Sequence, residues 1–200
     1  MNHISTWRRP DAYSRHRPGE LATPDAFRHA MAQLASGVAI VTCLHGDTPK
    51  GLLVSALTTV SIEPARMLFC VRKAASAHDA LLRSDDCAIA ILAEQDHLEA
   101  VRFYTSELSA ERFHPSNWRL EADQPPRHRA PLVSLLGRIS YRMDAGANTI
   151  FIVDVTETHA APGRPLVYFD RGFRSLRAPD ELSADLESLS GVTVWAAPAR

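Results

Sequence analysis

Short apolar runs separated by polar turns dominate the chain and predict more strands than helices. Strands are runs of about four to eight residues rich in β-branched side chains, whereas helices repeat apolar residues every three or four positions. The runs that we interpret as strands are 38–44, 51–61, 67–71, 87–92, 135–143, 149–158, 166–169 and 173–176. Closely spaced strands joined by tight turns favour an antiparallel barrel or sandwich over a sheet of βαβ units.

Helical patterns are fewer and shorter. A helix start is predicted at residues 23–25, where Thr23 is a typical N-cap, Pro24 a typical first helical residue and Asp25 an acid in the first turn. This helix is expected to run to about Ala35. Further helices are expected at 78–82, 98–103 and 179–191, and a last edge strand at 192–195. The fold class predicted is therefore mainly β, with a few flanking helices.

The most informative stretch is the predicted strand from Gly51 to Ser61. Hydroxyls at Ser55, Thr58, Thr59 and Ser61 interrupt an otherwise aliphatic, uncharged run. Such a pattern is typical of a strand with one face on a core and the other on a polar ligand. A half-buried strand whose hydroxyls only face water would give the same pattern, because Thr has a good β propensity. This stretch alone leaves both interpretations open.

The pattern also predicts the domain organisation. Residues 1–22 are polar and rich in Arg, which predicts a flexible arm, and 23–177 form one domain followed by a helical tail at 178–200. Residues 105–131 show little periodicity. Long ordered loops are often functional lids or subunit contacts, so we expect this excursion to have such a role.

Composition excludes several function classes. The 200 residues are 46% hydrophobic and 22% charged with a formal net charge of -1, which is typical of a globular domain with no bulk attraction to nucleic acid or anionic lipid. No uncharged apolar stretch is long enough to span a membrane, and the first residues contain no apolar leader. We expect a cytoplasmic protein with no nucleic-acid or membrane partner.

Motifs for the commonest chemistries are missing. The three cysteines, Cys43, Cys70 and Cys87, lie in apolar runs and are assigned to the core as free thiols. The nine histidines show no metal-ligand spacing, so no metal site is predicted. The carboxylates of Glu94, Asp96 and Glu99 are interpreted as the solvated face of a helix. Phosphate-binding glycine loops and the hydrolase elbow are absent from the sequence.

Several separated blocks together resemble one family. These are 27–42, which contains the run Ser36-Gly37-Val38, then 51–61, then Glu111-Arg112-Phe113, and finally 166–173. In order and spacing they are similar to the flavin reductase-like, FMN-binding split-barrel family. The resemblance implies a homodimer that passes a hydride from NADH or NADPH to FMN or FAD, and a partner monooxygenase that receives the reduced flavin.

The resemblance also implies which residues form the site. By position, flavin and nicotinamide are expected to contact Ser36, Gly37, Val38, Ser55, Ala56, Leu57, Thr58, Ser61, Lys73, Ser76, Asn148 and Phe169. Cofactors carry hydride transfer themselves, so no side-chain acid or base is predicted. The expected role of Asn148 is to orient the nicotinamide.

The chain departs from the family pattern at three positions. The family usually has Ser where this chain has Ala75, so Ser76 and Lys73 are expected to hold the flavin phosphate instead. It usually has Asn at Ala90 and His at Asn148. An Asn keeps a donor and an acceptor but cannot become cationic.

Three functions follow as hypotheses. The first is an NAD(P)H-dependent flavin reductase that supplies a separate oxygenase. The second, favoured by the three departures, is a non-catalytic split-barrel protein that carries or senses flavin. The third is an enzyme like pyridoxamine-phosphate oxidase. The 51–61 strand is evidence against this third hypothesis, because the strand contains no Arg- or Lys-rich phosphate site.

Overall fold

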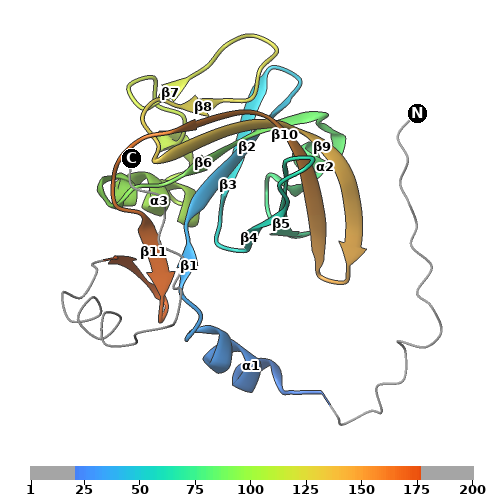
Figure 1. Ribbon diagram of the computed structural model, residues 1–200, viewed down its shortest axis with the longest axis vertical. Helices are drawn as coiled ribbons and strands as arrows, with labels where there is room; N and C mark the ends of the chain where they lie inside the picture. Colours follow the sequence, from blue (N-terminus) through green and yellow to red (C-terminus); the bar gives the residue numbers. More distant parts are fainter. Residues whose placement is uncertain (1–20, 177–200) are drawn as a thin grey trace, which may run out of the picture.

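A seven-stranded antiparallel sheet forms the body of the computed structural model, which describes residues 21–176 (Figure 1). The strand order is β3-β2-β6-β9-β10-β5-β4. The strands are β2 Ala39–His45, β3 Thr48–Val54, β4 Leu57–Ser61, β5 Arg66–Arg72, β6 Asp86–Ile91, β9 Val133–Ala145 and β10 Asn148–Ala160. The predicted mainly-β, antiparallel architecture is confirmed.

The two edge strands of this sheet, β3 and β4, are consecutive in the chain and joined only by Ser55 and Ala56. A flat sheet would separate its edges by about 29 Å, whereas two linking residues reach only about 11 Å. The sheet therefore curls into a barrel. The single strand predicted over 51–61 is wrong, because the chain leaves β2 at Val54 and joins β5 from Leu57 onward.

A small second sheet is attached to the side of the barrel. It has the order β1-β11-β12, from β1 Ser36–Gly37, β11 Leu166–Phe169 and β12 Gly172–Ser175. Ser36 and Gly37, for which no strand was predicted, pair with Tyr168 and Val167. The amide of Leu166 donates to the carbonyl of Leu92 at 2.9 Å, which fixes this sheet to the end of β6.

Helix α1, Pro24–Met31, precedes β1 and stands off the barrel (Figure 1). The predicted N-cap is confirmed, since the Thr23 hydroxyl accepts a hydrogen bond from the Ala26 amide at 3.3 Å. The helix ends at Met31, earlier than the expected Ala35, because the next amides bond three residues back and tighten the chain into β1. None of its residues is buried in this chain.

Two short helices lie against the barrel, α2 His78–Arg83 and α3 His97–Tyr104, with single turns of 3₁₀ helix at Glu94–Asp96 and Ser109–Glu111. The 105–131 excursion contains a two-stranded ladder of β7 Trp118–Arg119 and β8 Arg127–His128. In α3 the prediction that Glu99 faces solvent is wrong. Its exposure is 4%, whereas the neighbouring Leu98 is 58% exposed.

Two hydrophobic clusters hold the structure together. One fills the barrel, where Phe69 and Phe151 stack with ring centroids 5.2 Å apart. The other lies between the barrel wall, α3 and the excursion, and contains Phe103 and Trp118. Gly51 allows this close packing, since a Cβ there would lie 3.0 Å from a ring atom of Phe103.

The predicted placement of the cysteines is only partly right. Cys43 and Cys87 are fully buried, and burial raises the pKa of both thiols. Cys70 is only half-buried on the outer face of β5. All three are free thiols.

Several predictions concern residues outside the described part of the chain. They are the arm up to residue 20, the tail at 178–200, the helix at 179–191 and the strand at 192–195. Within residues 21–176, no helix has the length and apolar character needed to cross a membrane.

Candidate functional site

A cavity of about 860 Å³ lies on the outside of the barrel, bounded by the Ser55–Ala56 link, the loop after β5 and the end of α3. This volume is within the usual range of roughly 300–1,000 Å³ for small-molecule sites. The cavity is lined by Val38, Leu52, Leu53, Val54, Ser55, Ala56, Cys70, Val71, Arg72, Ala75, Ser76, Phe103, Tyr104, Ser106, Arg112, Asn148, Tyr168 and Phe173.

A second cavity of about 420 Å³ adjoins the first, with which it shares four lining residues. Both are lined by Ser55, Ala56, Cys70 and Tyr168. The second cavity extends toward α1 and is also lined by Met31, Leu34, Ser36, Leu57, Thr58 and Leu68. Together the two cavities form one long site that runs from the loop after β5 to α1.

The side chains of β5 alternate between the barrel core and the outer face, and those on the outer face form the floor of this site. Phe69 and Val71 point into the barrel core, so Leu68, Cys70 and Arg72 point outward. Leu68 and Cys70 line the smaller cavity, whereas Cys70 and Arg72 line the larger one. The floor is therefore apolar toward α1 and cationic at the opposite end.

Most of the predicted site residues lie together in this long site. Eight of the twelve line one or both cavities, namely Ser36, Val38, Ser55, Ala56, Leu57, Thr58, Ser76 and Asn148. They come from β1 and the residue after it, the β3–β4 link, the start of β4, the loop after β5 and the start of β10. The fold thus brings together residues up to 112 positions apart in sequence, the separation of Ser36 and Asn148.

The other four predicted residues do not line either cavity. The Ser61 hydroxyl donates to the Pro64 carbonyl in the turn after β4. The Lys73 ammonium forms an ion pair with Asp144 at 2.6 Å. Gly37 and Phe169 alternate with the lining residues beside them in β1 and β11.

Sequence reasoning missed several lining residues, chiefly Arg72, Tyr104, Arg112, Tyr168 and Phe173. Three of these, Arg112, Tyr168 and Phe173, lie inside the blocks that carry the family resemblance, so the signal was present without a role attached. Arg72 had a weaker signal, its place at the end of a strand beside Lys73.

Among residues 21–176, the side chains that line the larger cavity include two arginines and no carboxylate. Arg112 is already engaged, since it donates to the carbonyls of Arg102 at 2.9 Å and Thr105 at 2.7 Å and lies over the Phe103 ring. Burial lowers the pKa of Arg112. Burial also raises the pKa of Tyr168, so its phenol remains a hydrogen-bond donor at neutral pH.

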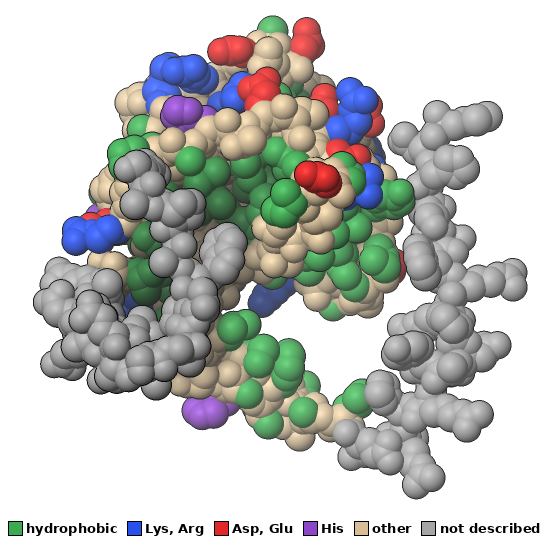
Figure 2. Space-filling view, viewed as in Figure 1, with side chains coloured by type: hydrophobic (Ala, Val, Ile, Leu, Met, Phe, Trp, Pro, Cys, Tyr) green, Lys and Arg blue, Asp and Glu red, His purple; other side chains and the backbone are tan. Residues whose placement is uncertain are grey.

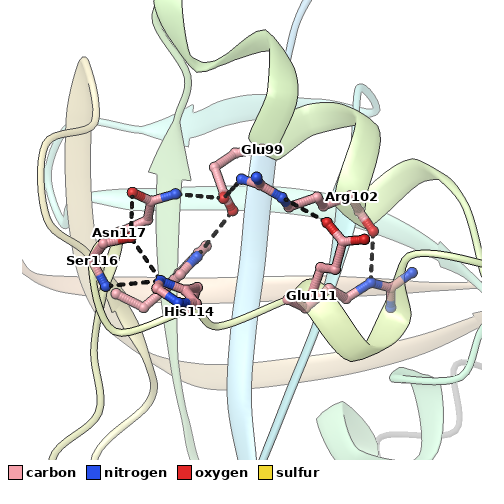
Figure 3. Close-up of polar contacts among 8 residues, drawn as sticks. Glu99, Arg102, Glu111, His114, Ser116 and Asn117 are labelled. Carbon is pink, nitrogen blue, oxygen red and sulfur yellow. Dashed lines mark hydrogen bonds and ion pairs between the residues drawn. The ribbon is translucent and has the colours of Figure 1, made fainter.

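A buried carboxylate ties the excursion to α3 (Figure 3). Glu99 accepts hydrogen bonds from Asn117 at 2.7 Å, from the Trp118 indole at 3.0 Å and from Arg102 at 2.5 Å, and Arg102 also pairs with Glu111 at 3.6 Å. Burial works to raise the pKa of Glu99, but these hydrogen bonds outweigh it and hold the pKa below its usual value. We call these residues the Glu99 network.

The cavity-lining loop after β5 is fixed at both ends. The Lys73 amide donates to the Ala147 carbonyl at 3.0 Å. The buried His78 ring lies 2.9 Å from the Thr149 hydroxyl and 3.0 Å from an Asp79 carboxylate oxygen. Thr149 is the neighbour of Asn148, so the loop and the start of β10 are held together as one unit.

Comparison with known proteins identifies the family. A family model for the flavin reductase like domain matches residues 31–177. The FMN reductase (NADH) RutF of Klebsiella variicola (strain At-22) is 31% identical over 163 residues, which cover 80% of this chain and 98% of that protein. The chain therefore belongs to the flavin reductase-like family, and its curled sheet is that family's split barrel.

Two further proteins are similar over most of the chain. The reductase component of a 4-nitrophenol 4-monooxygenase/4-nitrocatechol 2-monooxygenase from Rhodococcus opacus is 31% identical over 143 residues, 72% of this chain and 76% of that protein. The NADH:FAD oxidoreductase SgcE6 of Streptomyces globisporus, solved with NAD and FAD fragments, has a TM-score of 0.71 and 27% identity, and the match covers 80% of this chain and 98% of that chain.

Proposed function

We propose that this protein is an NAD(P)H-dependent flavin reductase, which transfers a hydride from NADH or NADPH to FMN or FAD. The proposal rests on the long site, which is apolar at one end and cationic at the other. Eight of the residues that the family resemblance implied line this site. The similarity to the reductases of Klebsiella and Rhodococcus supports the same activity.

The residues present fit a flavin. A flavin ring is flat and apolar with a polar edge, and the floor of Leu68 and Cys70 beside the hydroxyls of Ser55 and Thr58 offers both kinds of surface. The flavin phosphate requires a cation and hydroxyl donors, which Arg72 and Ser76 supply at the other end. The combined cavity is large enough for such a ligand.

The protein's own contribution is to bind and orient. When bound, the flavin and the nicotinamide supply the hydride chemistry themselves. Asn148, at the rim between β10 and the loop after β5, offers a carboxamide that orients the nicotinamide by hydrogen bonding. Tyr168 and Phe173 cover the site from the second sheet, and Phe103 and Tyr104 cover it from α3.

A non-catalytic flavin carrier or sensor is the second candidate. Ala75 lines the larger cavity without a hydroxyl, and Asn148 has no titratable group there. Ala90 bears less on the choice, because it is buried in the cluster beneath α3 and does not line either cavity. Loss of these polar groups favours weak flavin binding, which equally suits a reductase whose flavin diffuses away as a product.

We infer two protein partners. The first is a flavin-dependent monooxygenase that receives the reduced flavin, as the name of the Rhodococcus relative suggests. The second is another copy of this chain. Hydrophobic side chains on α1 and just before and after it are exposed (Figure 2), namely Leu21, Phe27, Met31 and Leu34. Because Met31 and Leu34 also line the smaller cavity, a second copy packed there would help to close the site.

We also propose that the protein works in the cytoplasm. Its three described cysteines are free thiols, two of them fully buried. Reducing compartments keep thiols in this state.

The activity is tested by following the oxidation of NADH and of NADPH by the purified protein, with and without added flavin. We expect oxidation only when FMN or FAD is present. If every combination of donor and flavin stays at the rate without enzyme while flavin still binds, the reductase proposal fails and the carrier or sensor takes its place.

A further inference from the structure

Two consecutive basic residues at the end of β5 have different environments. Lys73 is held by Asp144 in an ion pair of 2.6 Å and does not line the cavity. Arg72 lines the cavity and is exposed, and its side chain has no hydrogen-bond or ion-pair partner within residues 21–176. A guanidinium directed at a ligand site without a carboxylate partner retains its full capacity for an anion.

Arg72 is also the better placed of the two cavity arginines. The Arg112 guanidinium is used on main-chain carbonyls at the end of α3, where it has a structural role. Arg72 is the last residue of β5, and its register partner is Asn148, the first residue of β10. Ser76, four residues further along the chain, lines the same cavity.

The surroundings of Arg72 are rigid, which a specific anion site requires. The backbone of β5 and β10 is hydrogen-bonded up to the Arg72–Asn148 pair. The loop that follows is held by the Lys73 amide and by the contact between His78 and Thr149. The Lys73–Asp144 ion pair therefore anchors the loop, and the neighbouring Arg72 remains available for the ligand.

We propose that Arg72, with the Ser76 hydroxyl, binds a phosphate group of the nucleotide in this cavity, and that Lys73 does not. The inference rests on the proposed function and assigns to it a residue that the sequence did not. A guanidinium presents two parallel N–H donors to phosphate oxygens, and Ser76 adds a third donor. The apolar floor leading away from Arg72 then accommodates the flat ring of the same ligand.

Two phosphates have this chemistry, that of the flavin and the pyrophosphate of the nicotinamide dinucleotide. The floor favours the flavin, because Leu68 and Cys70 continue directly from Arg72 along the same face of β5. Binding measurements with one nucleotide at a time separate the two sources, and they do not depend on turnover.

The experiment measures equilibrium binding of riboflavin, FMN and NADH to the wild type and to three variants, Arg72→Gln, Lys73→Gln and Arg83→Gln. Arg83 is a matched control, since it is an exposed arginine on α2 that lines neither cavity. We expect Arg72→Gln to weaken FMN binding by about tenfold or more, the usual loss for a charge-assisted hydrogen bond. Riboflavin, which lacks the phosphate, should bind within about twofold of the wild type in every variant.

The outcomes are distinct. If Arg72→Gln is the only variant that weakens FMN binding, Arg72 binds the flavin phosphate. If Arg72→Gln weakens NADH binding and leaves FMN binding unchanged, Arg72 binds the dinucleotide phosphate. The proposal is overturned if Arg72→Gln matches Arg83→Gln for both nucleotides, or if Lys73→Gln causes the larger loss. Failure of the reductase proposal would show separately, as a wild type that binds FMN but oxidises no NADH.

Discussion

Arg72 and Asn148 are direct partners across β5 and β10, and both line the larger cavity. The sequence drew attention to Asn148 because it cannot become cationic. The structure places a guanidinium beside it, as its partner across the two strands. The cation at this end of the site is therefore supplied by Arg72 and not by position 148.

Asn148→Ala tests whether this carboxamide orients the nicotinamide. We expect kcat/KM for NADH to fall about tenfold, the ~1.4 kcal/mol of one modest hydrogen bond, with little change in FMN affinity. Steady-state kinetics together with FMN binding check this. An unchanged kcat/KM would show that Asn148 does not contact the nicotinamide.

Asn148→His asks what a titratable group would add at the same position. We expect a new pH dependence of kcat/KM, with an apparent pKa below the ~6.5 of a free imidazole, because the neighbouring Arg72 disfavours a second positive charge. Kinetics from pH 5 to 8, compared with the wild type, measure it. If kcat/KM depends on pH in the same way in Asn148→His and in the wild type, residue 148 does not contact the nicotinamide.

Glu99→Gln tests the Glu99 network. The carboxylate accepts three hydrogen bonds in a buried position, so we expect a loss of about 2 kcal/mol in the free energy of unfolding at neutral pH. For a chain of this size that corresponds to a fall in Tm of about 4–8 °C. Thermal unfolding measures the difference between variant and wild type.

The pH dependence of that difference provides the control. The folded pKa of Glu99 lies below its unfolded value of ~4.3, so its contribution is complete above that pH and is lost as the pH falls through the folded pKa. The gap in Tm between Glu99→Gln and the wild type should therefore narrow progressively below about pH 4.3. A gap of constant size across this range would show that the carboxylate charge is not what stabilises the excursion.

Gly137→Ala tests the close approach of β9 and β10. An added Cβ would lie 2.5 Å from a methyl carbon of Val153 and 2.6 Å from the backbone oxygen of Asp154, so we expect a loss of about 1–3 kcal/mol in the free energy of unfolding. In the control Gly163→Ala, the new Cβ would meet only the end of the Leu132 side chain at 3.1 Å. Denaturant unfolding of both variants should separate them, and equal stability would contradict the strand packing described.

Phe27→Ser combined with Met31→Ser tests the second copy on α1. Both side chains are exposed in the single chain, so the double variant should leave the stability of the monomer unchanged and shift the protein from dimer to monomer. Light scattering at micromolar concentration measures the mass. A wild type that already has the monomer mass of 22.0 kDa, with full activity, would contradict the homodimer.

Local features of the sequence were sufficient to predict most strands and helices within residues 21–176. The cap at Thr23 and the β-branched runs each act over a few residues and appear in the structure within about four positions of their predicted limits, except that the run 51–61 is divided between β3 and β4. Eight of the twelve site residues that the resemblance implied lie in one long site. The resemblance could identify them because its sequence blocks occur along the chain in the family's order.

Only the tertiary structure decided the contacts made between distant segments. Glu99 is buried because Asn117 and Trp118 approach it from the excursion, and helical periodicity contains no information about those partners. Closure of the barrel breaks the hydroxyl-rich strand at Ser55, since the chain there passes from one edge of the sheet to the other. The choice between Arg72 and Lys73 likewise depends on Asp144, which lies 71 residues from Lys73 in the sequence. Asp144 forms an ion pair with Lys73, and the adjacent Arg72 remains available for a ligand.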